Sequence, residues 1–452
     1  MAVPIGNFGF FNAPGPYSGP ETPLGKPGAP AEPITNPFLP GGDTFVAGGY
    51  PANPPAVPPG FTPVNFIPKF EPGKLGFTPG DLSQAGSLVV VDQFIQMPIF
   101  GIGAAPAMLE QPHGHLVSES AKGDGYQGNL IPSEYMPKFA PAMHKIAQAL
   151  NEPDVPADEF KKRLDLSIGI NTVNLLETMS ERLEGLKEAG LHHSAVNLSY
   201  GASQAGALEN HYLEVRSAWS EWQPVQDFKK PLLENYARAF GLDSAKLMSQ
   251  DPKQSGPERA RLQQALADRV SEVMNHSPAI QEARQHYATA VQELEANHNS
   301  VVVSASNGGQ LLERLARDRG EDSPPLKLGP KFFDNVLATP ETTVVGATAG
   351  QGQEERVAAY SSDYQEVDVY ADGRAPLAAY PGEEPAQGTS FASPKVAGVM
   401  SSLHKLYPEK SSAEIEAMLK DELSHQLLSY DGRVERPVLN QGAHSGMLSR
   451  YT

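Results

Sequence analysis

The chain has 452 residues, enough to bury one large core or two domains. It carries 35 basic and 53 acidic residues, a formal net charge of −18, and no basic block stands out. This balance argues against nucleic acid or an anionic membrane surface as a partner, because their phosphates would be repelled. The chain has no cysteine, which excludes a disulfide framework and thiolate chemistry.

The N-terminus has no basic region followed by an apolar run, so no secretory signal peptide is recognised. No run approaches the roughly 18 apolar residues that a membrane span requires, and none is predicted. We therefore expect a cytoplasmic protein, one exported by a signal-independent route, or one whose signal has already been removed.

Residues 1–82 are rich in Pro and Gly, as in Pro51–Pro59, and such segments cannot hold a helix or a central strand. This region is predicted to be an extended or disordered arm. The alternative is a docking or export segment that binds a partner.

The first strong strand signal is the apolar run at residues 87–92, since a short continuous run is typical of a strand buried on both faces. Asp92 closes this run at its carboxyl end, where open α/β sheets place their ligands. A single Asp in such a place is also a common turn or cap residue.

His113 and His115 come next in the chain. One interpretation is that each is an ordinary core or surface histidine. A second is a metal pair with Glu110 or Glu119 nearby, but no third ligand stands at a firm spacing, and no metal is predicted.

Helix patterns follow near 141–150 and 157–164, and a convincing amphipathic helix spans 171–189. The run 195–198 is another buried strand, and the residues Ser199, Tyr200 and Gly201 follow it.

From about 205 to 276 the chain is helical and charged, and a further helix covers 279–297. Trp219 and Trp222 both fall in the first of these regions, where we expect them to pack it against the core.

Two more strand patterns lie at 300–304 and 342–347. The first is followed by Ser306, Asn307 and Gly308, and an Asn-Gly pair by itself most often marks a turn.

The stretch 387–398 begins with small residues and continues as a helix with an apolar stripe at spacings of three and four. Pro394 suits a first helical turn, and Pro408 ends the run. Ser390 would therefore sit where free backbone N–H groups and the positive end of the helix dipole favour an anion. A small-residue N-cap is the alternative interpretation. A capping box at Ser411 opens a last helix, and the final thirty residues are predicted to be a turn-rich surface segment.

The amino-acid sequence around Ser390 resembles a motif of a known family. Gly-Thr-Ser-x-Ala-x-Pro-x-Val-Ala-Gly is the serine motif of the subtilisin-like serine proteases (subtilases), and residues 388–398 match it at every fixed position. Three further segments resemble that family. Asp92 ends a strand as its catalytic Asp does, and His113 matches the first residue of its His motif, although His115 and Leu116 depart from it. Asn307 takes the position of its oxyanion asparagine.

The resemblance implies an α/β fold, a three-layer sandwich with a mostly parallel central sheet. It implies a serine endopeptidase with Asp92, His113 and Ser390 as the triad, Asn307 in the oxyanion hole, and Ser199, Tyr200 and Gly201 as a substrate-binding edge. No cofactor is predicted, because the calcium ligands found in some family members are not recognisable here. The substrates would be proteins or peptides. The alternative function is an inactive scaffold that binds protein partners through the arm and the helical region.

The resemblance also divides the chain. Residues 83–452 would form the catalytic domain, preceded by the arm at 1–82. The family core needs one helix between its Ser-Leu-Gly strand and the next strand, and 279–297 supplies it. Residues 205–276 are therefore a helical insertion, expected either to wall the substrate groove or to decorate its far side.

Overall fold

The computed structural model describes residues 34–35, 44–45, 82, 84–94, 113–135, 140–219, 223–320, 323–350, 352–362, 364, 366–378, 385–428, 435–440 and 443. Within the Pro-rich arm, the described strands β1 (Ile34–Thr35) and β2 (Thr44–Phe45) pair antiparallel. The prediction of an extended or disordered arm otherwise lies outside the described residues, as do Trp222 and Glu110.

One large sheet organises the described part of the chain. Its strands lie in the order β12-β13-β9-β7-β6-β5-β3-β4, with β8 paired to β7. The pairs from β13 to β4 are parallel, and the pairs β12–β13 and β7–β8 are antiparallel. The strands are β3 (Leu88–Asp92), β4 (Leu130–Glu134), β5 (Ala195–Leu198), β6 (Ser300–Ser304), β7 (Thr343–Ala349), β8 (Arg356–Val357), β9 (Val369–Asp372), β12 (Ser424–Leu428) and β13 (Glu435–Leu439). A separate antiparallel pair comprises β10 (Arg374–Ala378) and β11 (Pro385–Gln387).

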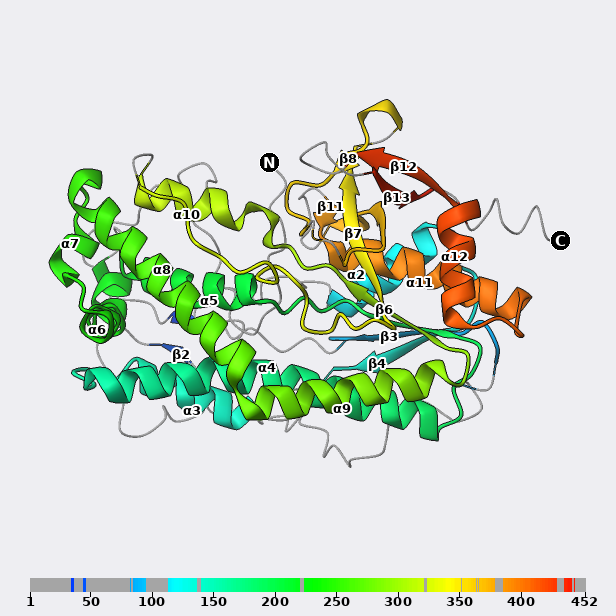
Figure 1. Ribbon diagram of the computed structural model, residues 1–452, viewed down its shortest axis with the longest axis horizontal. Helices are drawn as coiled ribbons and strands as arrows, with labels where there is room; N and C mark the ends of the chain where they lie inside the picture. Colours follow the sequence, from blue (N-terminus) through cyan, green and yellow to red (C-terminus); the bar gives the residue numbers. More distant parts are fainter. Residues whose placement is uncertain are drawn as a thin grey trace, which may run out of the picture.

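The central strands are buried on both faces, as their continuous apolar runs predict. Alternate residues of β3 enter two different hydrophobic clusters, with Val89 and Val91 on one face and Leu88 and Val90 on the other. Helices cover both faces (Figure 1). The predicted α/β fold with a mostly parallel sheet is confirmed. One face carries α2 (His113–Gly123), α11 (Thr389–Leu406) and α12 (Ser412–Glu422), and the other carries α3 (Ala140–Leu150), α4 (Ala157–Glu188) and α9 (Pro278–Glu295).

The helical insertion extends beyond one end of the sheet, on the left of Figure 1. Its apolar residues join the same hydrophobic cluster as β3, β5 and β6, so it is continuous with the core. Trp219 is part of that packing, with the Arg259 guanidinium 3.9 Å from its ring centroid. The insertion contains α5 (Gln204–Arg216), η1 (Ser217–Trp219), α6 (Gln223–Phe240), α7 (Ser244–Met248) and α8 (Pro252–His276); the later elements η2 (Gly308–Gln310), α10 (Leu311–Arg319) and η3 (Gly352–Glu354) follow β6 and β7.

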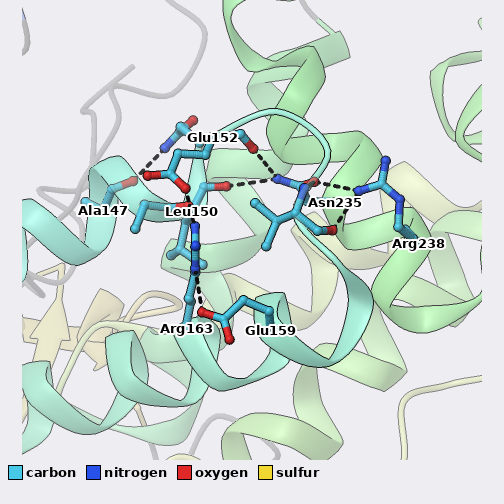
Figure 2. Close-up of polar contacts among 10 residues, drawn as sticks. Ala147, Leu150, Glu152, Glu159, Arg163, Asn235 and Arg238 are labelled. Atoms are coloured by element: carbon cyan, nitrogen blue, oxygen red, sulfur yellow. Dashed lines mark hydrogen bonds and ion pairs between the residues drawn. The ribbon is translucent and has the colours of Figure 1, made fainter.

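Asn235 of α6 fastens the insertion to the turn between α3 and α4, as Figure 2 shows. Its amide nitrogen donates to the carbonyls of Leu150 and Glu152 at 3.3 and 2.7 Å, and its oxygen accepts from the Val155 N–H at 3.2 Å. Asn235 is fully buried, and Arg163 and Arg238 add bonds to the carbonyls of Ala149 and Val155, each at 2.7 Å, so three side chains hold this turn.

Two local predictions differ from the structure, and one strand was not predicted. The helices expected at 157–164 and 171–189 are one continuous helix, α4, which passes through Gly169. Strand β4 contains Pro132, which hid it in the sequence but is tolerated because β4 is an edge strand. The final segment contributes the hairpin β12–β13 to the opposite edge instead of only turns. In the described residues, no helix is long and apolar enough to cross a membrane.

Candidate active site

Asp92 ends β3, between the neighbouring strands β4 and β5, and its side chain is fully buried. Its Oδ1 accepts the Gln93 N–H at 2.7 Å and lies 2.8 Å from Nδ1 of His113. Two hydrogen bonds therefore orient this carboxylate and aim it at the imidazole.

His113 is the first residue of α2, and the approach of that helix to β3 depends on Gly114. The Gly114 N–H donates to the Gln93 carbonyl at 2.8 Å, and a Cβ at Gly114 would lie 2.8 Å from that same oxygen. The His113 ring also packs against Phe391, the residue after Ser390, with 5.5 Å between centroids. Because Nδ1 faces Asp92, Nε2 lies on the opposite edge of the ring.

His115 lies apart from this arrangement. Its side chain is exposed, and its ring meets Phe94 edge-on at 5.6 Å. Glu119 pairs with Lys122 at 2.8 Å. Among the residues that the structure describes, no cluster of three or more His, Asp or Glu side chains is suited to hold a metal ion.

Ser390 is the second residue of α11, the helix predicted from the serine stretch. Its Oγ donates to the Ser199 carbonyl at 3.1 Å, and the Ser199 hydroxyl donates back to the Ser390 carbonyl at 2.9 Å. The end of β5 and the start of α11 are therefore joined directly at Ser390.

Asn307 follows β6 and is fixed by the residue before Ser390. Its Oδ1 accepts both the backbone N–H and the hydroxyl of Thr389, at 2.9 and 3.0 Å. These two bonds set the amide plane and direct the NH₂ group away from Thr389. A Cβ at Gly388 would lie 3.3 Å from that Nδ2, so the glycine leaves room for the amide.

The loop that carries Asn307 contains a strained residue. Ser306 has φ = 79°, a left-handed conformation that side chains other than glycine rarely adopt. Ser362 holds the loop in place: its N–H donates to the Ser306 carbonyl at 3.0 Å, and its hydroxyl accepts the Gly308 N–H at 3.1 Å. The local sequence gave no indication that Ser362 would hold this loop.

In the predicted substrate edge, the backbone carbonyls of successive residues point to opposite sides of the chain. The Ser199 carbonyl meets Ser390, whereas the carbonyls of Tyr200 and Ala202 accept from the Asn335 side chain and the Val336 N–H at 2.9 and 2.7 Å. Such alternation is that of an extended chain. The edge toward Ser390 thus offers the backbone of residues 199 and 201.

The Tyr200 side chain is not at that edge. Its ring is buried in the core and packs on Tyr135 with 4.5 Å between centroids. Burial raises the pKa of Tyr200 well above its usual range, and the nearby charge of Asp92 adds to the effect. Only the backbone of Tyr200 belongs to the predicted edge.

Comparison with known proteins agrees with the sequence motif. The sequence model of the Subtilase family (Peptidase_S8) matches residues 239–442, a segment that includes Asn307 and Ser390 but not Asp92 or His113. A search of curated proteins found no significant match.

Solved structures of subtilisin-like proteases are among the structural matches. Sphericase is 22% identical with a TM-score of 0.20, over 30% of this chain and 43% of its own, so this chain spans less than half of that protein. MycP1 from Mycobacterium smegmatis is 15% identical with a TM-score of 0.37, over 80% of each chain. The nisin leader peptidase NisP from Lactococcus lactis is 13% identical with a TM-score of 0.36, over 83% of this chain and 90% of its own.

The match of residues 239–442 to the Subtilase model agrees with the resemblance, and the chain carries the fold class that the resemblance predicts. This match supports a serine protease in general.

Proposed function

We propose that the chain is a serine endopeptidase with Ser390 as nucleophile, His113 as base, Asp92 as the carboxylate that orients the base, and Asn307 as an oxyanion donor. The observation that carries the proposal is a connected set of contacts at the carboxyl ends of β3, β5 and β6. Asp92 bonds to His113, the His113 ring packs against Phe391, the residue after Ser390, and Asn307 accepts two hydrogen bonds from Thr389, the residue before Ser390.

The chemistry follows from these positions. His113 Nε2 takes the hydroxyl proton as Ser390 Oγ attacks the peptide carbonyl carbon. The resulting oxyanion is stabilised by the Ser390 N–H and the Asn307 amide. The C–N bond then breaks, and the amine leaves with the proton from His113. Water attacks the acyl-enzyme with His113 again as base, and the proton returns to Ser390 as the acid product forms. Asp92 keeps the imidazole in the required tautomer throughout.

The substrate would add to the 199–201 backbone as a strand. In the structure the Ser199 carbonyl accepts the Ser390 hydroxyl. A substrate N–H that bonds to this carbonyl would release the hydroxyl toward His113, so binding would couple to activation of the nucleophile.

Labelling with a fluorophosphonate tests this proposal. The wild-type protein should form a covalent adduct at Ser390, and Ser390→Ala should form none. The matched control is His115→Ala, which removes an exposed imidazole from the same helix as His113 and should leave labelling unchanged. A protein that folds but does not label would support the scaffold alternative.

We also propose that the insertion borders the substrate edge. Helix α5 begins three residues after Gly201, and Ala205 lies 3.5 Å from the place of a Cβ on Gly308. Trp219→Ala would loosen the insertion without touching the triad. Cleavage of folded proteins should then change, while hydrolysis of a small activated ester should not; equal changes in both would contradict a bordering role.

A further inference from the structure

A single buried side chain spans the gap where β5 and β6 stop pairing. The parallel ladder between them ends at Leu198 and Val303. Beyond that point, the Asn335 amide nitrogen donates to the Tyr200 carbonyl at 2.9 Å and to the Ser304 carbonyl at 2.5 Å. One side-chain amide therefore bridges the two segments where the next backbone hydrogen bonds between β5 and β6 would form.

Asn335 is itself held rigidly. Its Oδ1 accepts the Leu337 N–H at 3.0 Å, and its own N–H donates to the Tyr364 hydroxyl at 3.1 Å. The side chain is 2% exposed, so water cannot replace these partners. The neighbouring Val336 N–H adds the bond to Ala202.

The two carbonyls bound by Asn335 belong to the segments that carry the proposed chemistry. Tyr200 follows Ser199, whose carbonyl meets Ser390, and Ser304 stands three residues before Asn307. The segments that carry the substrate edge and the oxyanion amide are thus joined by the side chain of Asn335.

We propose that Asn335 is a positioning residue that fixes the distance between the 199–201 substrate edge and Asn307. The inference rests on the proposed function for its kinetic consequence. Its structural part, that Asn335 holds the two segments together, stands independently. Misplacement of reacting groups by about 1 Å costs on the order of 10²-fold in rate, so a small relaxation here is enough to be measured.

Asn335→Ala removes both donors and tests the inference with two readouts. Amide hydrogen exchange should speed up in residues 199–203 and 305–309, and kcat for a peptide substrate should fall about 10- to 100-fold with a smaller change in KM. In an Asn307→Ala background the same change should cost much less, because the amide it positions is already gone.

Asn299→Ala is the matched control. Asn299 is equally buried and bridges the opposite ends of the same strands: its Oδ1 accepts the Ser194 N–H at 3.2 Å, and its Nδ2 donates to the Leu191 and Leu294 carbonyls at 3.0 Å. This variant should lose stability, yet its folded form should keep kcat within about twofold, since the bridge lies far from the reacting groups.

The inference is overturned if folded Asn335→Ala shows wild-type exchange in both segments, if its kinetic loss is fully additive with Asn307→Ala, or if Asn299→Ala loses as much kcat. Should Asn335→Ala fail to fold, Tyr364→Phe removes only the hydroxyl that anchors the Asn335 backbone, and it should raise exchange in both segments. If the wild-type protein hydrolyses nothing, the proposed function fails, and exchange alone decides whether Asn335 joins the segments.

Discussion

The two ends of β5 and β6 use the same residue types in different ways. At the amino ends, Asn299, Ser300 and His404 are at most 1% exposed, and Ser300 Oγ lies 2.8 Å from His404 Nε2. At the carboxyl ends, Asn307 and Ser390 keep 7% and 8% exposure.

The comparison teaches that residue type does not mark a functional site. At the amino ends, the buried asparagine and histidine contribute to stability, because their partners are internal and far from the proposed reacting groups. The same residue with a small exposed area can still meet a ligand. We therefore expect changes at the carboxyl ends to alter kinetics and changes at the amino ends to alter stability.

The largest expected effect is that of His113→Ala. Loss of the proposed base should lower kcat by on the order of 10⁶-fold, which is the magnitude known for loss of the catalytic histidine in subtilisin. Peptide hydrolysis kinetics measure it. His404→Gln, at the amino end, should leave kcat of the folded protein unchanged. If His115→Ala is the inactive variant instead, the base has been assigned two residues too early.

Asn307→Ala should have the next largest effect. Loss of one oxyanion donor lowers kcat by roughly 10²–10³-fold with little change in KM, a range that also comes from a subtilisin. Steady-state kinetics on a peptide substrate separate the two constants. A raised KM at unchanged kcat would show that Asn307 binds the ground state and does not act on the transition state.

His404 should make the amino end sensitive to acid. Burial, with a smaller contribution from His193 and His298, lowers the pKa of His404 to about 3. A pKa depressed below the unfolded value of about 6.5 means that stability is complete above pH 6.5 and is lost as pH falls toward 3. Between pH 6.5 and pH 5 the loss should be about 2 kcal/mol.

Denaturant unfolding at pH 7 and pH 5 measures this loss in the wild-type protein and in His404→Gln, which cannot titrate. The variant should show the smaller decrease. The same acid sensitivity in both proteins would place its origin elsewhere in the fold.

The smallest expected effect concerns backbone strain. Ser306→Gly should raise the free energy of unfolding by about 1 kcal/mol, because glycine adopts the left-handed conformation without a clash between its side chain and the backbone. Thermal unfolding measures it. Ser306→Ala keeps the Cβ and removes only the hydroxyl, so it should not stabilise the protein; stabilisation by both would point to the hydroxyl and not to φ.

The sequence by itself determined the central layers. The largely apolar runs at 88–91, 195–198 and 300–303 predicted buried parallel strands, because a strand covered on both faces is mostly apolar. The match at 388–398 predicted α11 and the resemblance to the subtilases, since that motif is specific at the level of single residues.

Other features were decided only in three dimensions. Pro132 concealed β4, whose place at the sheet edge depends on β3 and not on its own residues. Nothing local distinguishes Asn335 from a turn asparagine; its role comes from carbonyls 135 and 31 residues away in the chain. Local sequence patterns indicate whether a segment is buried. The partners of a buried polar group depend instead on which distant segments the fold brings to it.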